Sequence, residues 1–279
     1  MTAVLTAAVL HAGWNAIAKA SGDRLGLFGR AAVVSFALAV VLCGVSPLPD
    51  AAAWPWLVAS ALVHTLYNIG LMAAYQLGDF NQTYPLARGL GPLIVAVVAA
   101  MFLGEPLPPL PTAGVVIIAA AIGVLGLTPW KRIAHNRRAV LAAVLTGLAI
   151  ATYTLLDGVG VRRSGSPIGY LAWLIALHCG TMILAALALR KRRPSTTDKQ
   201  AGWGIGLVAG AMSMGAYGLV LWAQAHGALA AIAALRESSV VVAAILGAVL
   251  FHEPMSKVRI AASVAVVAGV VLLALPGIH

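Results

Sequence analysis

The chain has 279 residues, of which 61% are hydrophobic and 9% charged, and its formal net charge at pH 7 is +10. A soluble domain carries about 25% charged residues, so this composition excludes an ordinary soluble protein and predicts an all-α polytopic membrane protein. Most basic residues fall in short stretches between apolar segments, which is typical of membrane orientation. The expected partners are therefore the lipid bilayer and a small-molecule substrate, and not nucleic acid.

Ten segments are long and apolar enough to form transmembrane helices, which need about 20 mostly apolar residues. No positive charge precedes His11, as a signal peptide would require, so the first segment is expected to be a retained helix. The ten predicted segments are 2–20, 26–46, 54–77, 80–103, 110–127, 138–158, 166–189, 202–225, 228–251 and 256–275.

The loops between these segments differ in charge. Lysines and arginines concentrate in the loops that follow the first, fifth, seventh and ninth segments, whereas the opposite side has Arg162 and Arg163. Cytoplasmic loops are enriched in such residues. This distribution predicts that both termini lie outside the cytoplasm.

The sequence also repeats itself. The stretch "ARGLGPLIVAVVAAMFLGEPL" begins at Ala87, and "LRESSVVVAAILGAVLFHEPM" begins at Leu235. Positions 88 and 236, both arginine, differ by 148, as do positions 105 and 253, both glutamate before proline. The repeat predicts two five-helix units, residues 1–130 and 131–279. An odd number of helices in each unit would insert them in opposite orientations, an arrangement common in transporters.

The motifs "YPLARGLGPL", "LGEPL" and "HEPM", together with this repeat, resemble the EamA-type transporters of the drug/metabolite transporter superfamily. The stretches "HAGWN", "YTLLDG" and "LRESSVV" resemble a subgroup associated with phosphonate utilisation. The resemblance implies ten helices in two repeats, a multi-pass protein of the bacterial inner membrane, and metabolite export or exchange. It does not identify the substrate.

The leading prediction is a secondary transporter that moves a small anionic or zwitterionic metabolite by alternating access. The first segment has no acidic residue, whereas small multidrug exporters of the superfamily use a glutamate there to exchange protons for cations. An exporter of neutral or cationic drugs remains the alternative, followed by a non-transporting receptor and an intramembrane enzyme. No catalytic or metal-ligand motif is present, so we expect no enzyme activity, cofactor or metal. A monomer is expected, with a homodimer left open.

Arg88 and Arg236 are the main candidates for substrate binding. A charged side chain near the bilayer centre costs about 3 kcal/mol on insertion scales, so each needs a compensating role. Arg88 could form an ion pair with Asp79 or Asp157. Alternatively, both guanidinium groups could bind an acidic group of the substrate, because their planar fork matches carboxylate and phosphate.

Other polar residues fall on one face of their predicted helices and should face inward, because lipid penalises them. The predicted lining residues are Trp14, Asn15, Asn68, Tyr75, Tyr84, Tyr153, Tyr217 and Gln224. Asp157, His11 and His64 are candidates for proton coupling, and the sequence does not choose among them. Glu105 and Glu253 are expected to have gating or structural roles, and Gly89 and Pro92 permit a helix break beside Arg88.

Overall fold

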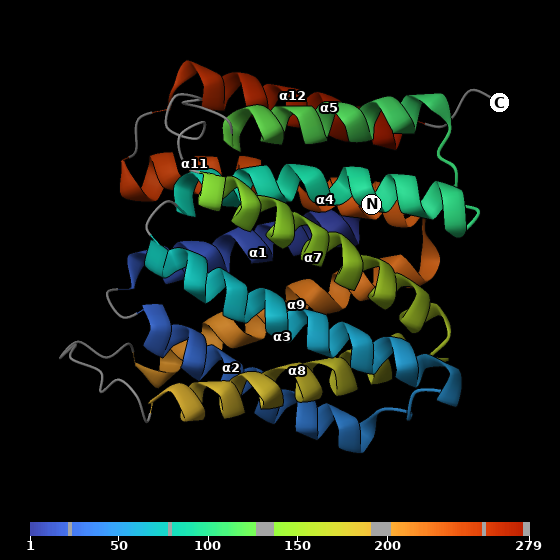
Figure 1. Ribbon diagram of the computed structural model, residues 1–279, viewed down its shortest axis with the longest axis vertical. Helices are drawn as coiled ribbons and strands as arrows, with labels where there is room; N and C mark the ends of the chain where they lie inside the picture. The colour runs from blue at the N-terminus through green and yellow to red at the C-terminus, as the bar shows by residue number, and fades with distance from the viewer. Residues whose placement is uncertain (22–23, 78–79, 127–136, 191–201, 253–254, 276–279) are drawn as a thin grey trace.

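The computed structural model describes residues 1–21, 24–77, 80–126, 137–190, 202–252 and 255–275, and within these ranges it contains helices and no strands (Figure 1). The first half begins with α1 (Thr2–Ala20) and α2 (Arg24–Val45). A short 3₁₀ helix, η1 (Ala51–Ala53), leads into α3 (Trp54–Leu77), which is followed by α4 (Phe80–Phe102) and α5 (Pro109–Gly126).

The second half begins with α7 (Arg137–Arg162), α8 (Pro167–Arg190) and α9 (Trp203–His226). It continues with α10 (Leu229–Arg236), α11 (Ser239–Phe251) and α12 (Lys257–Ala274). Nine of the ten predicted segments each correspond to one helix, with ends close to those expected. The ninth segment corresponds to both α10 and α11.

Several helices are long and apolar enough to cross a membrane. Six candidate spans occur within the described residues, and two shorter apolar helices, Leu90–Phe102 and Pro109–Leu125, accompany them. Large apolar side chains lie on the outside of the bundle, as at Val45, Phe102 and Met101, which are 76%, 74% and 71% exposed. A continuous apolar exterior of this kind suits contact with lipid. The protein is therefore a multi-pass membrane protein, and the crossing of all ten segments stays a prediction.

Helices from the two halves interleave. In Figure 1, α5 and α12 lie together at one edge of the bundle, and α2 and α8 lie together at the opposite edge. Between these edges, α1 packs mainly on α9, α3 packs mainly on α7, and α4 packs on both α7 and α5. The most extensive contacts of most helices are thus with the other half of the chain.

Each of the most extensively packed pairs of helices in the bundle has a counterpart in which every helix is replaced by the corresponding helix of the other half. In the sequence repeat, α1, α2 and α3 correspond to α7, α8 and α9, and α4 corresponds to α10 with α11. The pair α1–α9 therefore has the pair α7–α3 as its counterpart, and both pairs are in contact. The pairs α2–α9 and α3–α8 are related in the same way, as are α4–α7 and α1–α11. The two repeated segments, α4 and α10–α11, both lie in the inner part of the bundle, between its two edges.

The ninth predicted segment, 228–251, remains one candidate span, Leu229–Phe251, but a tight turn divides its helix into α10 and α11. The amide groups of Glu237 and Ser238 donate to the carbonyl groups three residues earlier, at Ala234 and Leu235, with N–O distances of 3.0 and 3.1 Å. The Ser238 hydroxyl donates to the Leu235 carbonyl at 2.7 Å. These tight turns and the side-chain bond replace the regular helical ladder, so the helix breaks directly after Arg236.

By contrast, α4 is continuous through the corresponding positions. The sequence predicted that Gly89 and Pro92 would permit a break there, yet the helix runs from Phe80 to Phe102. The break therefore lies in the helix that has neither glycine nor proline at this point.

Candidate functional site

Arg88 and Glu237 form a buried ion pair that joins α4 to the break between α10 and α11. Arg88 Nε donates to Glu237 Oε2 at 2.8 Å, and Arg88 Nη2 donates to Glu237 Oε1 at 2.9 Å. Both residues are almost inaccessible, with 7% and 4% of their surfaces exposed. Arg88 Nη2 also donates to Ser239 Oγ at 3.4 Å. Two parallel bonds between a guanidinium and a carboxylate are the strongest arrangement of such a pair.

The partner of Arg88 is not one of the two expected acids. Asp79 lies outside the described residues, and Asp157 is engaged by other side chains. Glu237 directly follows Arg236, and adjacent residues on a helix point about 100° apart. The carboxylate therefore faces α4 and not its own neighbour, so it is available to Arg88.

His11 extends this group onto α1. Its Nε2 lies 3.3 Å from Arg88 Nη1, and its Nδ1 lies 3.3 Å from the Trp14 indole Nε1. Arginine and indole nitrogens can only donate, and a neutral imidazole has one accepting nitrogen. His11 can thus accept one full hydrogen bond from these two donors. Trp14 itself packs edge-on against Phe28, with ring centroids 5.5 Å apart.

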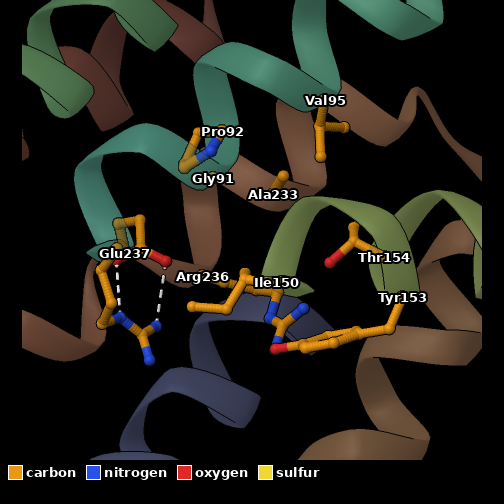
Figure 2. Close-up of a pocket in the computed structure, with 10 residues that line it drawn as sticks. Gly91, Pro92, Val95, Ile150, Tyr153, Thr154, Ala233, Arg236 and Glu237 are labelled. Atoms are coloured by element: carbon orange, nitrogen blue, oxygen red, sulfur yellow. Dashed lines mark hydrogen bonds and ion pairs between the residues drawn. The ribbon is translucent and has the colours of Figure 1, made fainter. Parts of the chain in front are cut away.

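Arg88, Arg236 and Glu237 line one pocket at the centre of the bundle (Figure 2). The pocket has room for about one water molecule, so the protein is contracted around it. Gly91, Pro92 and Val95 of α4 form one wall, Ile150, Tyr153 and Thr154 of α7 form another, and Ala233 belongs to α10. The structure thus places the two repeat-related arginines on the same lining, one from each half.

Arg236 differs from Arg88 because no ion pair joins it to Asp50, Glu105, Asp157 or Glu237, the four carboxylates that the structure describes. Its guanidinium carbon lies 5.9 Å from the centre of the Tyr217 ring, within reach of a cation–π contact. In Figure 2, the side chains of Arg236 and Tyr153 point toward each other across the pocket. Aromatic rings, and not a carboxylate, surround this charge.

A second polar group surrounds Asp157 on α7, whose carboxylate is fully buried. The Tyr170 hydroxyl donates to Oδ1 at 3.1 Å, and the Tyr217 hydroxyl donates to Oδ2. His64 Nε2 lies 3.2 Å from Oδ2 and 3.0 Å from the Tyr217 oxygen. The His64 ring also stacks on Tyr153, with centroids 4.0 Å apart. The structure therefore brings together the predicted residues Asp157, His64, Tyr153 and Tyr217.

Glu105 takes part in a clamp at one end of the bundle. Its Oε1 accepts a bond from Arg162 Nη1, and its Oε2 accepts the Leu229 amide at 3.1 Å. Arg162 also donates to the carbonyl groups of Gln224 and Gly227 at 2.8 and 2.6 Å. A carboxylate at a helix N-terminus is favourable, and here it connects the end of α4 to α7 and to the start of α10.

Three further predicted lining residues engage the backbone. The amide nitrogens of Asn15 and Asn68 each donate to the carbonyl one turn earlier, at His11 and His64, at 2.7 and 2.8 Å. Gln224 Nε2 lies 3.4 Å from the Thr154 carbonyl, and the buried Gln224 Oε1 has no hydrogen-bond partner among the described residues. The side chains of Tyr75 and Tyr84 and the whole of Glu253 lie outside the described part of the structure, whereas Gly89 lies within α4.

Sequence reasoning missed the roles of Glu237, Tyr170 and Thr154. Glu237 had a detectable signal, because a lone acid inside an apolar segment needs a cationic partner and Arg88 needed an anionic one. Tyr170 and Thr154 carried no such signal, since tyrosine and threonine are tolerated in apolar segments without partners. Within the described residues, no three histidine, cysteine, aspartate or glutamate side chains form a group that could hold a metal ion.

Comparison with known proteins supports the fold and shows a family resemblance in the second half of the chain. Residues 137–275 match the sequence profile of the EamA-like transporter family. In addition, 27 chains of solved structures match. One, described as the crystal structure of a protein, has a TM-score of 0.78 and 19% sequence identity, with 100% of this chain and 98% of that chain covered. No curated protein matches the sequence significantly. The protein is thus a multi-pass membrane protein, and its residues 137–275 are similar to the EamA-like transporter family.

Proposed function

We propose that the protein is a secondary transporter for a small anionic or zwitterionic metabolite, and that the acidic group of the cargo binds Arg236. The observation that carries this proposal is the contrast in the central pocket. Arg88 is neutralised by Glu237, whereas Arg236 lies on the same lining without an ion pair to a described carboxylate.

Arg236 is suited to an acidic ligand by chemistry and by position. A guanidinium offers a bidentate fork to carboxylate or phosphate, and a buried cation gains more from an anion than an exposed one does. Glu237 is the carboxylate on the described lining, and it could also attract the ammonium group of a zwitterion. Cationic cargo would instead meet the guanidinium of Arg236, which has no ion pair to a described carboxylate.

Movement of the cargo would use the two halves as repeats of opposite orientation, residues 1–130 and 131–279. The exchange of packing pairs between the halves supports this arrangement, as does the position of the pocket between α4, α7 and α10. The pocket is contracted, so cargo larger than water requires the helices to separate on one side. We therefore propose alternating access, and the resemblance to EamA-type transporters suggests export or exchange across a bacterial inner membrane.

Purified protein in lipid vesicles would test the substrate class. Labelled L-glutamate, L-alanine and L-lysine serve as anionic, zwitterionic and cationic probes. We expect flux of the anionic or zwitterionic probe and loss of this flux in Arg236→Gln. Arg163→Gln is the matched control, because Arg163 is exposed and its guanidinium carbon lies 5.0 Å from the Trp56 ring centre, away from the pocket. Preference for lysine, or full flux in a folded Arg236→Gln protein, would refute the proposal.

A further inference from the structure

The proposed cargo contact at Arg236 does not use the carboxylate of Asp157, and the chemistry of the group around Asp157 suggests a separate ligand. We propose that Asp157 and His64 together bind one proton when an anion binds at Arg236 and release it when the anion leaves. Cargo and proton would then cross the membrane together. This inference rests on the proposed function and selects the coupling site among Asp157, His64 and His11.

The geometry allows the Asp157–His64 pair to accept a proton. Tyr217 donates its hydroxyl proton to Asp157, so the Tyr217 oxygen accepts from His64 Nε2, which also lies 3.2 Å from Asp157 Oδ2. The hydrogen of His64 is therefore placed on Nε2. An added proton can reside on His64 Nδ1, forming an ion pair with Asp157, or on the carboxylate itself. In such a coupled pair the proton belongs to both groups.

Charge balance explains why the proton should follow the cargo. The described charged side chains at the pocket and the Asp157 group are Arg88, Arg236, Glu237 and Asp157. Two guanidinium and two carboxylate groups cancel while His64 is neutral. A bound monoanion would leave one negative charge in a medium of low dielectric constant, which is costly. One proton on the Asp157–His64 pair restores neutrality.

Two tyrosines connect the proposed proton site to the cargo site. Tyr217 contacts Asp157 through its hydroxyl and faces Arg236 through its ring. Tyr153 stacks on His64 and also lines the pocket. An anion that draws Arg236 toward itself would thus disturb both rings and, through them, the hydrogen bonds of Asp157 and His64.

The surroundings contribute further titratable and charged groups. His178 on α8 lies beside His64, with ring centroids 5.3 Å apart, and its buried Nδ1 has no hydrogen-bond partner among the described residues. It therefore places a second imidazole next to the pair. Described titratable and charged groups lie on every element packed against α7: His64 and Tyr67 on α3, Arg88 on α4, Tyr170, His178 and Cys179 on α8, Tyr217 and His226 on α9, Arg236 with Glu237 at the end of α10, and Asp50 beside η1.

His11 is a poorer candidate for the proton. It already lies against the Arg88 guanidinium, and both of its ring nitrogens face donors. An imidazolium there would set two positive charges side by side and leave both contacts without an acceptor. His64 differs because its near neighbour is a carboxylate.

Calorimetry on the purified protein would count the protons. Binding of L-glutamate, which is a monoanion at pH 7, is measured at this pH in buffers that differ in ionisation enthalpy. We expect uptake of about one proton per anion in the wild type and none in Asp157→Asn or His64→Gln, each checked for folding by gel filtration. Asp50→Asn is the matched control at the bundle end. Anion binding without proton uptake, or unchanged uptake in both site variants, would overturn the proposal.

Flux in vesicles provides the second readout. If one proton crosses with each monoanion, a difference of one pH unit across the vesicle membrane sustains about a tenfold difference in probe concentration between its two sides. We expect the wild type to reach this ratio. Asp157→Asn should still exchange labelled for unlabelled probe but should not accumulate it. Exchange without pH-driven accumulation in the wild type would refute the coupling and leave the proposed function intact. Neither binding nor exchange of any probe in the wild type would refute both.

Discussion

Arg88 and Arg236 occupy equivalent positions of a repeated sequence, yet the protein uses them differently. Arg88 lies on a continuous helix and is held by two bonds to Glu237. Arg236 ends a broken helix and lies among aromatic rings. The difference in pairing arises from Glu237, which has no acidic counterpart in the first half, where position 89 is glycine. A symmetric sequence can therefore build an asymmetric site with a single added carboxylate.

Loss of the Glu237 carboxylate should produce the largest effect. Glu237→Gln would leave Arg88 buried without its counter-charge, and breaking a buried pair from one side costs about 3–5 kcal/mol. We expect a corresponding fall in the free energy of unfolding in detergent. The double variant Arg88→Gln with Glu237→Gln should regain much of this stability. A Glu237→Gln protein as stable as the wild type would mean that the pair does not support the fold.

A lysine at each of the two arginine positions would sharpen the comparison. Arg88→Lys keeps the charge but loses one of the two bonds to Glu237, and a hydrogen bond to a charged group contributes about 1.5–3 kcal/mol. Arg236→Lys should leave stability unchanged, because no ion pair to a described carboxylate is lost, and should weaken binding of the anionic probe. Thermal unfolding and probe binding, measured on both variants, separate these outcomes. Equal destabilisation by both substitutions would contradict the distinction.

The smallest effect on stability is expected at the clamp. The Arg162 and Glu105 side chains are 30% and 20% exposed, and pairs near the surface contribute about 0.2–1 kcal/mol. Arg162→Gln should therefore fold normally but open this end of the bundle more often. A cysteine at Ala228 should then react faster with a water-soluble maleimide.

The opposite end provides the control for the clamp. Phe251 ends α11 there, and Lys19 lies over its ring at 4.9 Å. A cysteine at Ser21, beside Lys19, should react more slowly in Arg162→Gln if the two ends open alternately. Both cysteines are placed in a protein whose Cys43 and Cys179 are replaced by alanine. Equal acceleration at Ala228 and Ser21 would argue against alternating access.

The helices could be predicted from the sequence because lipid demands long apolar segments with internally satisfied backbones. The sequence repeat also predicted that Arg88 and Arg236 occupy equivalent positions in the two halves. The break after Arg236 could not be predicted, since Ser238 produces it with a local hydrogen bond that a serine elsewhere in a helix need not make. The choice of Glu237 over Asp157 as partner of Arg88 depends on how α4, α7 and α10 pack, which no single segment encodes.

The interleaving of the halves has a consequence for biosynthesis. The principal packing partner of α1 is α9, and α1 begins at Thr2 whereas α9 begins at Trp203. About 200 residues separate them, so at about 5–20 residues per second the first helix waits about 10–40 s for its partner. His11 and Trp14 must reside during this interval in lipid or against the insertion machinery. Assembly of the bundle is therefore a late event that waits for the second half of the chain.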